Sequence, residues 1–113
     1  MNRRRCNRAR FIALAPVKDL LTDSTLGYIG DISTGGMMLF SPRAVAQPGH
    51  RRVAITLPRH DGETVTVTGE IRIAWHRPAE RGTSGSTGCQ FVNFNPGEKL
   101  TLLRSAREFS LRA

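Results

Sequence analysis

Two short polar stretches of the chain carry residue types that suit the binding of an anionic ligand. The first ten residues, MNRRRCNRAR, contain five arginines, and residues 29–36, IGDISTGG, place a carboxylate, a hydroxyl and a Gly-Gly pair between two apolar runs. Guanidinium forks bond phosphate groups or the edge of guanine in bidentate fashion. Taken singly, the first stretch is typical of a solvated basic arm and the second of a hairpin turn.

The overall charge also favours an anionic partner. The chain of 113 residues has 17 Lys and Arg against 9 Asp and Glu, a formal net charge of +8 and a pI near 11.2. Arginine supplies nearly all of this positive charge, since Lys18 and Lys99 are the only lysines. Charge of this sign and size raises the local concentration of anions such as nucleotides or nucleic acid.

A catalytic or metal-binding function finds no support in the residue pattern. The three histidines are His50, His60 and His76. They fall at separate turns and strand ends, without the spacing that gathers metal ligands. Ser33 lies outside any nucleophile motif, and Cys6 and Cys89 lie far apart. We therefore expect no enzyme, no catalytic residue, no metal and no cofactor.

The absence of a secretory signal and of a long apolar run predicts a soluble protein in a reducing cytoplasm. The charged N-terminus is not followed by an apolar segment, and no run approaches the roughly 18 residues of a membrane span. In that setting both cysteines stay free thiols.

Alternating apolar and polar residues predict strands from residue 10 onward. We expect six strands, at residues 10–18, 25–32, 36–41, 51–57, 63–76 and 89–94. Asp61-Gly62 predicts a hairpin turn before the longest strand. In that strand the alternation puts Trp75 on the apolar face with Ile71 and Ile73, interrupted by Gly69 where a long strand must bend.

The C-terminal segment changes to a helical period. Asn95 suits an N-cap and Pro96 the first helical position, and an apolar stripe follows along Leu100, Leu103 and Ala106. We expect one domain over residues 1–113, with a flexible arginine-rich arm at 1–9, a mainly β barrel of six antiparallel strands at 10–94 and an amphipathic helix at 95–111 across one opening.

The two polar stretches together resemble the PilZ family, the bacterial receptor domains for cyclic di-GMP. The family carries an RxxxR element, often RRxxxR, on an N-terminal arm, and further along the chain the element (D/N)xSxxG. The matching residues here are Arg3, Arg4 and Arg8, then Asp31, Ser33 and Gly36. The resemblance continues through GEIRIAW, GCQFVNF and the terminal amphipathic helix, so it covers nearly the whole chain.

This resemblance implies a six-stranded antiparallel barrel with a terminal helix and cyclic di-GMP as ligand. Arg4 and Arg8 would bond its phosphates or guanine edges. Asp31 would accept from guanine N–H groups, and Ser33 would bond a phosphate or a guanine. Gly36 would let the backbone approach the ligand closely.

Four neighbouring residues have two interpretations each. Gly35 shapes the turn or borders the ligand, and Arg5 faces water or wraps a phosphate. Arg10, which begins the first strand, is structural or lines the rim of the site. Trp75 packs in the core or stacks on a guanine, a contact that contributes about 1–3 kcal/mol.

Three functions remain open on the sequence alone. The first is a cyclic di-GMP receptor or adaptor that changes its surface on binding and so regulates a partner protein, as yet unidentified. The second is a small nucleic-acid-binding barrel, favoured by net charge but disfavoured by the 6% aromatic content. The third is a PilZ-like interaction protein that does not bind nucleotide.

Overall fold

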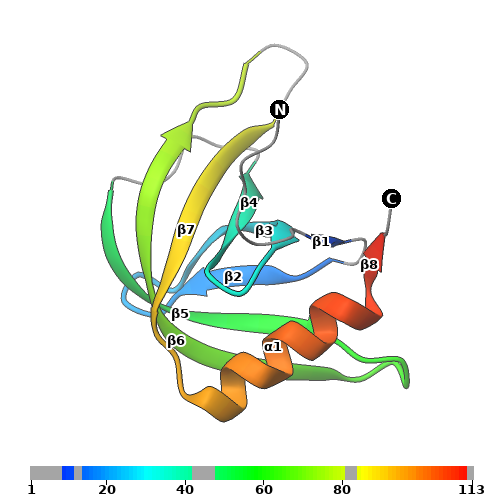
Figure 1. The fold of residues 1–113 in the computed structure, drawn as a ribbon. Coiled ribbons are helices and arrows are strands. Elements are labelled where there is room, and N and C mark those ends of the chain that lie inside the picture. The colour runs from blue at the N-terminus through cyan, green and yellow to red at the C-terminus, as the bar shows by residue number, and fades with distance from the viewer. Residues whose placement is uncertain (1–8, 12–13, 42–47, 81–83, 112–113) are drawn as a thin grey trace.

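The computed structural model describes residues 9–11, 14–41, 48–80 and 84–111, and Figure 1 shows a curved, closed sheet with one helix. Six antiparallel strands close on themselves in the order β2-β5-β6-β7-β4-β3, and pairing between β3 and β2 completes the ring. Their bounds are β2 Pro16–Asp19, β3 Ser24–Ile32, β4 Gly36–Ser41, β5 Gly49–Pro58, β6 Thr64–Arg77 and β7 Gly85–Asn93. The predicted six-stranded antiparallel barrel is confirmed.

Two shorter strands extend this sheet at β3. β1 (Ala9–Phe11) pairs with β3 on one side and with β8 (Ser110–Leu111) on the other. The single first strand expected at residues 10–18 is therefore wrong, because the structure has β1 and β2 in its place. Both lie along the same edge of β3, where β1 pairs with Asp31 and Ile32 and β2 with residues 24–28.

Apolar side chains that alternate along the strands fill the barrel. The side chains with no exposed surface include Val17, Leu39, Val53, Ile55, Leu57, Ile71 and Leu102. Gly69 of β6 makes room in this packing, since a Cβ there would lie 2.5 Å from the ring of Phe94. The pairing of β6 with β7 also shifts register beside this glycine, between Glu70 and Ile71, where β7 contributes one extra residue, Val92.

A bulge in β6 itself turns Trp75 out of the core. The register to β7 shifts between Ile73 and Trp75, so the alternation of inner and outer residues moves by one position. Ile73 is 1% exposed and Trp75 is 42% exposed. The expectation that Trp75 shares the apolar face of Ile71 and Ile73 is therefore wrong, and the reason is an extra residue that the sequence pattern does not reveal.

Helix α1 (Pro96–Glu108) lies across one end of the barrel (Figure 1). The Asn95 side chain accepts a hydrogen bond from Gly97 N at 2.8 Å, and Pro96 occupies the first turn, as predicted. The buried face consists of Leu102, Ser105 and Ala106, so the apolar stripe is rotated relative to the predicted one. Leu100 is 49% exposed.

The helix also ends earlier than predicted. It stops at Glu108, whereas we expected helix up to residue 111, because Ser110 and Leu111 pair with β1 as strand β8. Backbone hydrogen bonds to a neighbouring strand replace the last helical turn that the sequence period suggests.

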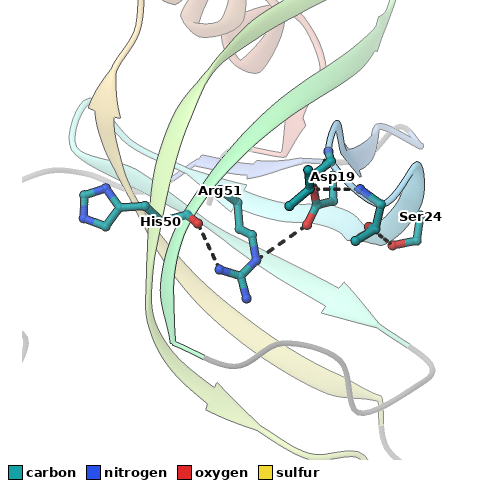
Figure 2. A network of polar contacts seen from close by, with 6 residues as sticks. Asp19, Ser24, His50 and Arg51 are labelled. Atoms are coloured by element: carbon teal, nitrogen blue, oxygen red, sulfur yellow. Dashed lines mark hydrogen bonds and ion pairs between the residues drawn. The ribbon is translucent and has the colours of Figure 1, made fainter.

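The buried carboxylate of Asp19 shapes the turn between β2 and β3, at the end of β3 away from Asp31 (Figure 2). Asp19 is 4% exposed, and its Oδ1 accepts hydrogen bonds from the backbone N–H groups of Leu21 and Thr22. Its Oδ2 lies 3.5 Å from Arg51 Nε of β5, and Arg51 Nη1 donates to the carbonyl of His50. This network stabilises the end of β3 opposite Asp31.

Candidate ligand-binding site

The polar stretch of residues 31–36 forms the end of β3 and a tight turn into β4, as the hairpin interpretation predicted. Ser33 N donates to the Gly36 carbonyl at 2.9 Å, which closes the turn. The Ser33 hydroxyl lies 3.4 Å from the same carbonyl, a long hydrogen bond. Asp31 is half-buried within β3 rather than in the turn itself.

Gly36 serves the fold directly. A Cβ at this position would lie 2.1 Å from the Cys89 carbonyl of β7, so only glycine lets the two strands approach this closely. No atom lies within 4 Å of the position that a Cβ on Gly35 would take. The Gly35 carbonyl accepts a hydrogen bond from Phe91 N at 3.0 Å. Neither glycine adopts a positive φ, contrary to the usual expectation for such a turn.

Cross-strand pairing aligns five residues in one row over the outer face of the barrel. Arg10 pairs with Asp31, Asp31 with Met38, Met38 with Gly88 and Gly88 with Trp75. Strands lie about 4.8 Å apart, so Trp75 and Asp31 stand about 14 Å from each other across the sheet. The structure thus brings two predicted site residues, far apart in sequence, to one surface.

The indole of Trp75 covers Gly88 in this row. A Cβ at Gly88 would lie 2.1 Å from Trp75 Nε1, so the ring occupies the space that a side chain at this strand position would fill. The guanidinium Cζ of Arg77 lies 6.0 Å from the centroid of the ring. Trp75 thus presents an exposed aromatic ring, the kind of surface on which a base can stack.

A second row, next along the strands, contains residues that sequence reasoning missed. Gly36 pairs with Gln90, and Gln90 pairs with Arg72. Arg72 Nε donates to Gln90 Oε1 at 2.9 Å, and Nη2 donates to the same oxygen. The alternation within GEIRIAW and GCQFVNF places both side chains outward, but only the register of β4, β6 and β7 shows that they adjoin Gly36.

The arginines predicted to bind the ligand, Arg3, Arg4 and Arg8, and also Arg5, lie outside the described residues. Arg10 lies in β1, with its Cα opposite Asp31. Arg8 is joined directly to Ala9, whose Cα pairs with that of Ile32, the residue before Ser33. The first described residue, Ala9, therefore lies at the β3 end that carries Asp31 and Ser33.

The three histidines have local partners. His50 Nδ1 lies 2.8 Å from Glu70 Oε2, His60 stacks on Phe109 with ring centroids 4.7 Å apart, and His76 Nδ1 lies 3.0 Å from Thr87 Oγ1. In the part of the chain that the structure describes, no three His, Cys, Asp or Glu side chains gather as metal ligands. The same residues include no helix of the length and apolarity of a membrane span.

The closed barrel, the helix across its opening and the polar turn on its outer wall are the features of a small closed β-barrel domain. The sequence model of the PilZ domain matches residues 2–108. The chain therefore belongs to the PilZ domain family, a family of non-enzymatic receptor domains for cyclic di-GMP.

Two solved structures resemble the fold. One is the Bacillus subtilis inhibitor of motility MotI/DgrA, with a TM-score of 0.74 and 16% sequence identity over 96% of this chain and 51% of that chain. This chain thus spans about half, 51%, of the length of MotI/DgrA. The other is the PilZ domain of YcgR from Escherichia coli with c-di-GMP, with a TM-score of 0.66 and 20% identity over 96% and 92% of the two chains. No curated protein sequence matches the chain significantly.

Proposed function

We propose that this protein is a cyclic di-GMP receptor or adaptor module that changes its surface on binding the nucleotide and so regulates a partner protein in the bacterial cytoplasm. The ligand contacts would come from Arg3, Arg4 and Arg8 on one segment and from Asp31, Ser33 and Gly36 on another. Family membership supports the ligand class, and the resemblance to YcgR, solved with c-di-GMP, is consistent with it.

The observation that carries the proposal is the pairing of β1 with the end of β3. This pairing sets Ala9, the residue that follows Arg8 in the sequence, opposite Ile32, and the Ser33 hydroxyl nearby makes a hydrogen bond long enough to be exchanged for a ligand contact. Arginine forks and a carboxylate together match a ligand with phosphates and guanine N–H groups.

The outer row supplies the third part of the proposed site. Trp75 faces outward on the same surface as Asp31, and its ring is wide enough to stack on one base of the ligand. Arg5, Arg10 and Gly35 are secondary candidates beside these residues. In this proposal Arg5 wraps a phosphate, Arg10 lines the rim of the site, and Gly35 borders the ligand where space is open.

Titration calorimetry with cyclic di-GMP tests the proposal. We expect tight binding, with a stoichiometry that separates one nucleotide from two, and much weaker binding of GTP, GMP and single-stranded DNA at about 150 mM salt, where purely charge-driven contacts are weakened. DNA binding as tight as that of cyclic di-GMP would favour the nucleic-acid function, and no binding of either would favour a PilZ-fold interaction protein.

The variant Arg8→Ala separates the ligand site from the fold. Removing one guanidinium should weaken cyclic di-GMP binding more than tenfold, which is about 1.4 kcal/mol. The melting temperature should stay close to that of the parent protein, unlike that of the core variant Leu102→Ala, whose side chain is 0% exposed. A fall in melting temperature as large as that of Leu102→Ala would assign Arg8 a structural role instead.

A further inference from the structure

We propose that Arg72 and Gln90 form a guanine-reading subsite of the same nucleotide site, an inference that rests on the proposed function. Neither residue belongs to the two sequence motifs, and the structure places both on the outer wall directly beside the motif turn. Their chemistry selects guanine over adenine.

The position follows from the strand register. Gln90 is the cross-strand partner of Gly36, and Arg72 is the partner of Gln90 on the next strand. The neighbouring residue of β7, Phe91, donates its N–H to the Gly35 carbonyl at 3.0 Å, so the turn and the Gln90 backbone are fixed to each other. Both side chains are exposed, and they point to the same face as Trp75.

The hydrogen bonds within the pair leave it with donors only. Arg72 donates from Nε and from Nη2 to Gln90 Oε1, which occupies both lone pairs of that oxygen. The opposite orientation of the amide would set its NH₂ group against the guanidinium, donor facing donor, so the contact fixes the amide orientation. The Gln90 Nε2 hydrogens and the remaining Arg72 N–H groups are then the hydrogen-bonding groups offered to a ligand.

A surface of donors matches one purine and opposes the other. Guanine presents two acceptors, N7 and O6, on its Hoogsteen edge, whereas adenine presents an acceptor at N7 and a donor at N6. A free glutamine suits adenine because it offers an acceptor and a donor together. Here Arg72 occupies the acceptor of the glutamine, Gln90 Oε1, so the pair offers only donors. The N6 donor of adenine would face one of these donors, and that hydrogen bond would be lost.

The outer wall has the dimensions for such a contact. Gln90 and Gly88, which lies beneath the Trp75 ring, are two residues apart on β7, or about 7 Å. A base stacked on Trp75 therefore lies within reach of the Arg72 and Gln90 side chains. The pair completes a surface bounded by Trp75 on one side and by Ser33 on the other.

The test compares cyclic di-GMP and cyclic di-AMP by calorimetry on the full chain and on three variants. Arg72→Ala should weaken cyclic di-GMP binding about tenfold or more and narrow the preference over cyclic di-AMP, because it frees the acceptor of Gln90. Gln90→Ala should weaken cyclic di-GMP binding as well. Arg72→Lys keeps the charge but loses the planar fork, so it should also narrow the preference.

Arg104→Ala is the matched control, because it removes the same charge from an exposed position of α1. We expect its affinities for both nucleotides to equal those of the parent protein, and all four variants to melt near the parent temperature. The subsite alone would be overturned if the parent protein binds cyclic di-GMP and the Arg72→Ala and Gln90→Ala variants keep its affinity and its preference over cyclic di-AMP. A parent protein that binds no cyclic di-GMP would overturn the proposed function and the subsite together.

Discussion

The Cys89 thiol lies on the inner face of β7, where it is 5% exposed and free of any disulfide. Burial disfavours the thiolate and raises the pKa of this group from its ordinary value of 9.0 to about 12. The side chain therefore packs as a small apolar residue in the barrel.

This pKa predicts a loss of stability at alkaline pH. Below pH 9 the thiol is protonated in the folded and unfolded states alike, so its contribution is fully present. Between pH 9 and pH 12 only the unfolded chain loses this proton, and the free energy of unfolding falls by about 1.4 kcal/mol per pH unit. Urea unfolding at several pH values checks this.

The variant Cys89→Ala isolates the effect of the thiol from that of other titrating groups. Its free energy of unfolding should be lower at neutral pH because of the lost packing, but it should fall less steeply above pH 9 than that of the parent protein. Parallel profiles for the two proteins would contradict the pKa assigned to Cys89.

Trp75 is the single tryptophan of the chain, so its fluorescence reports directly on the proposed site. We expect the emission to change on addition of cyclic di-GMP and to saturate at the stoichiometry found by calorimetry. We expect Trp75→Ala to lose about 1–3 kcal/mol of binding free energy for cyclic di-GMP. Trp75→Phe keeps a ring and should lose less. Unchanged emission at saturating nucleotide would remove Trp75 from the site.

At the scale of elements, the turn from β3 to β4 depends on adjacent glycines with different roles. Gly36 lies against the Cys89 carbonyl of β7, and Gly35 faces open space. The pair explains why a motif associated with a ligand also contains a residue that the fold itself requires.

We predict that Gly36→Ala lowers the melting temperature strongly and that Gly35→Ala leaves it nearly unchanged. The Cβ of the first variant would lie 2.1 Å from a backbone oxygen, so β4 and β7 must separate, with an expected cost of about 1–3 kcal/mol or more. Thermal unfolding followed by circular dichroism compares the two. Equal melting temperatures would show that the turn adapts and that Gly36 matters only for the ligand.

At the scale of the whole molecule, β1 pairs both with the end of β3 and with the short strand β8 that follows the helix. It pairs with Asp31 of β3 through Arg10, and with Ser110 and Leu111 of β8, which follows α1. Figure 1 shows β1 and β8 next to the C-terminal end of the helix. A ligand that engages the arginines before β1 therefore acts on a strand that is hydrogen-bonded to the end of the helix segment.

We predict that cyclic di-GMP raises the NMR backbone order parameters of residues 2–8. Residues 1–9 contain four arginines and few apolar side chains, so ligand phosphates would supply the contacts that offset the roughly 1–2 kcal/mol per residue of backbone ordering. Chemical shifts should also change at Ser110 and Leu111, and much less at Leu21 in the turn at the other end of β3. High order parameters before ligand addition would contradict this mechanism.

Much of the fold was predictable because local patterns and packing agree. Residues 36–41 are predicted and observed as one strand, and Asn95 and Pro96 start the helix as their types suggest. Among the predictions that failed, those for Trp75 and for residues 110–111 share one cause. In both cases pairing with a neighbouring strand, through a bulge or through β8, overrides the local period.

The sequence alone determined the strand count of the barrel, the terminal helix and the two motifs that resemble PilZ domains, since each depends on the order and type of nearby residues. Only the tertiary structure decided which outward side chains share a surface. Trp75, Asp31 and the Arg72 and Gln90 pair come from three strands, β6, β3 and β7, and the register between strands aligns them. Register depends on hydrogen bonds and bulges between segments distant in sequence, so no local pattern specifies it.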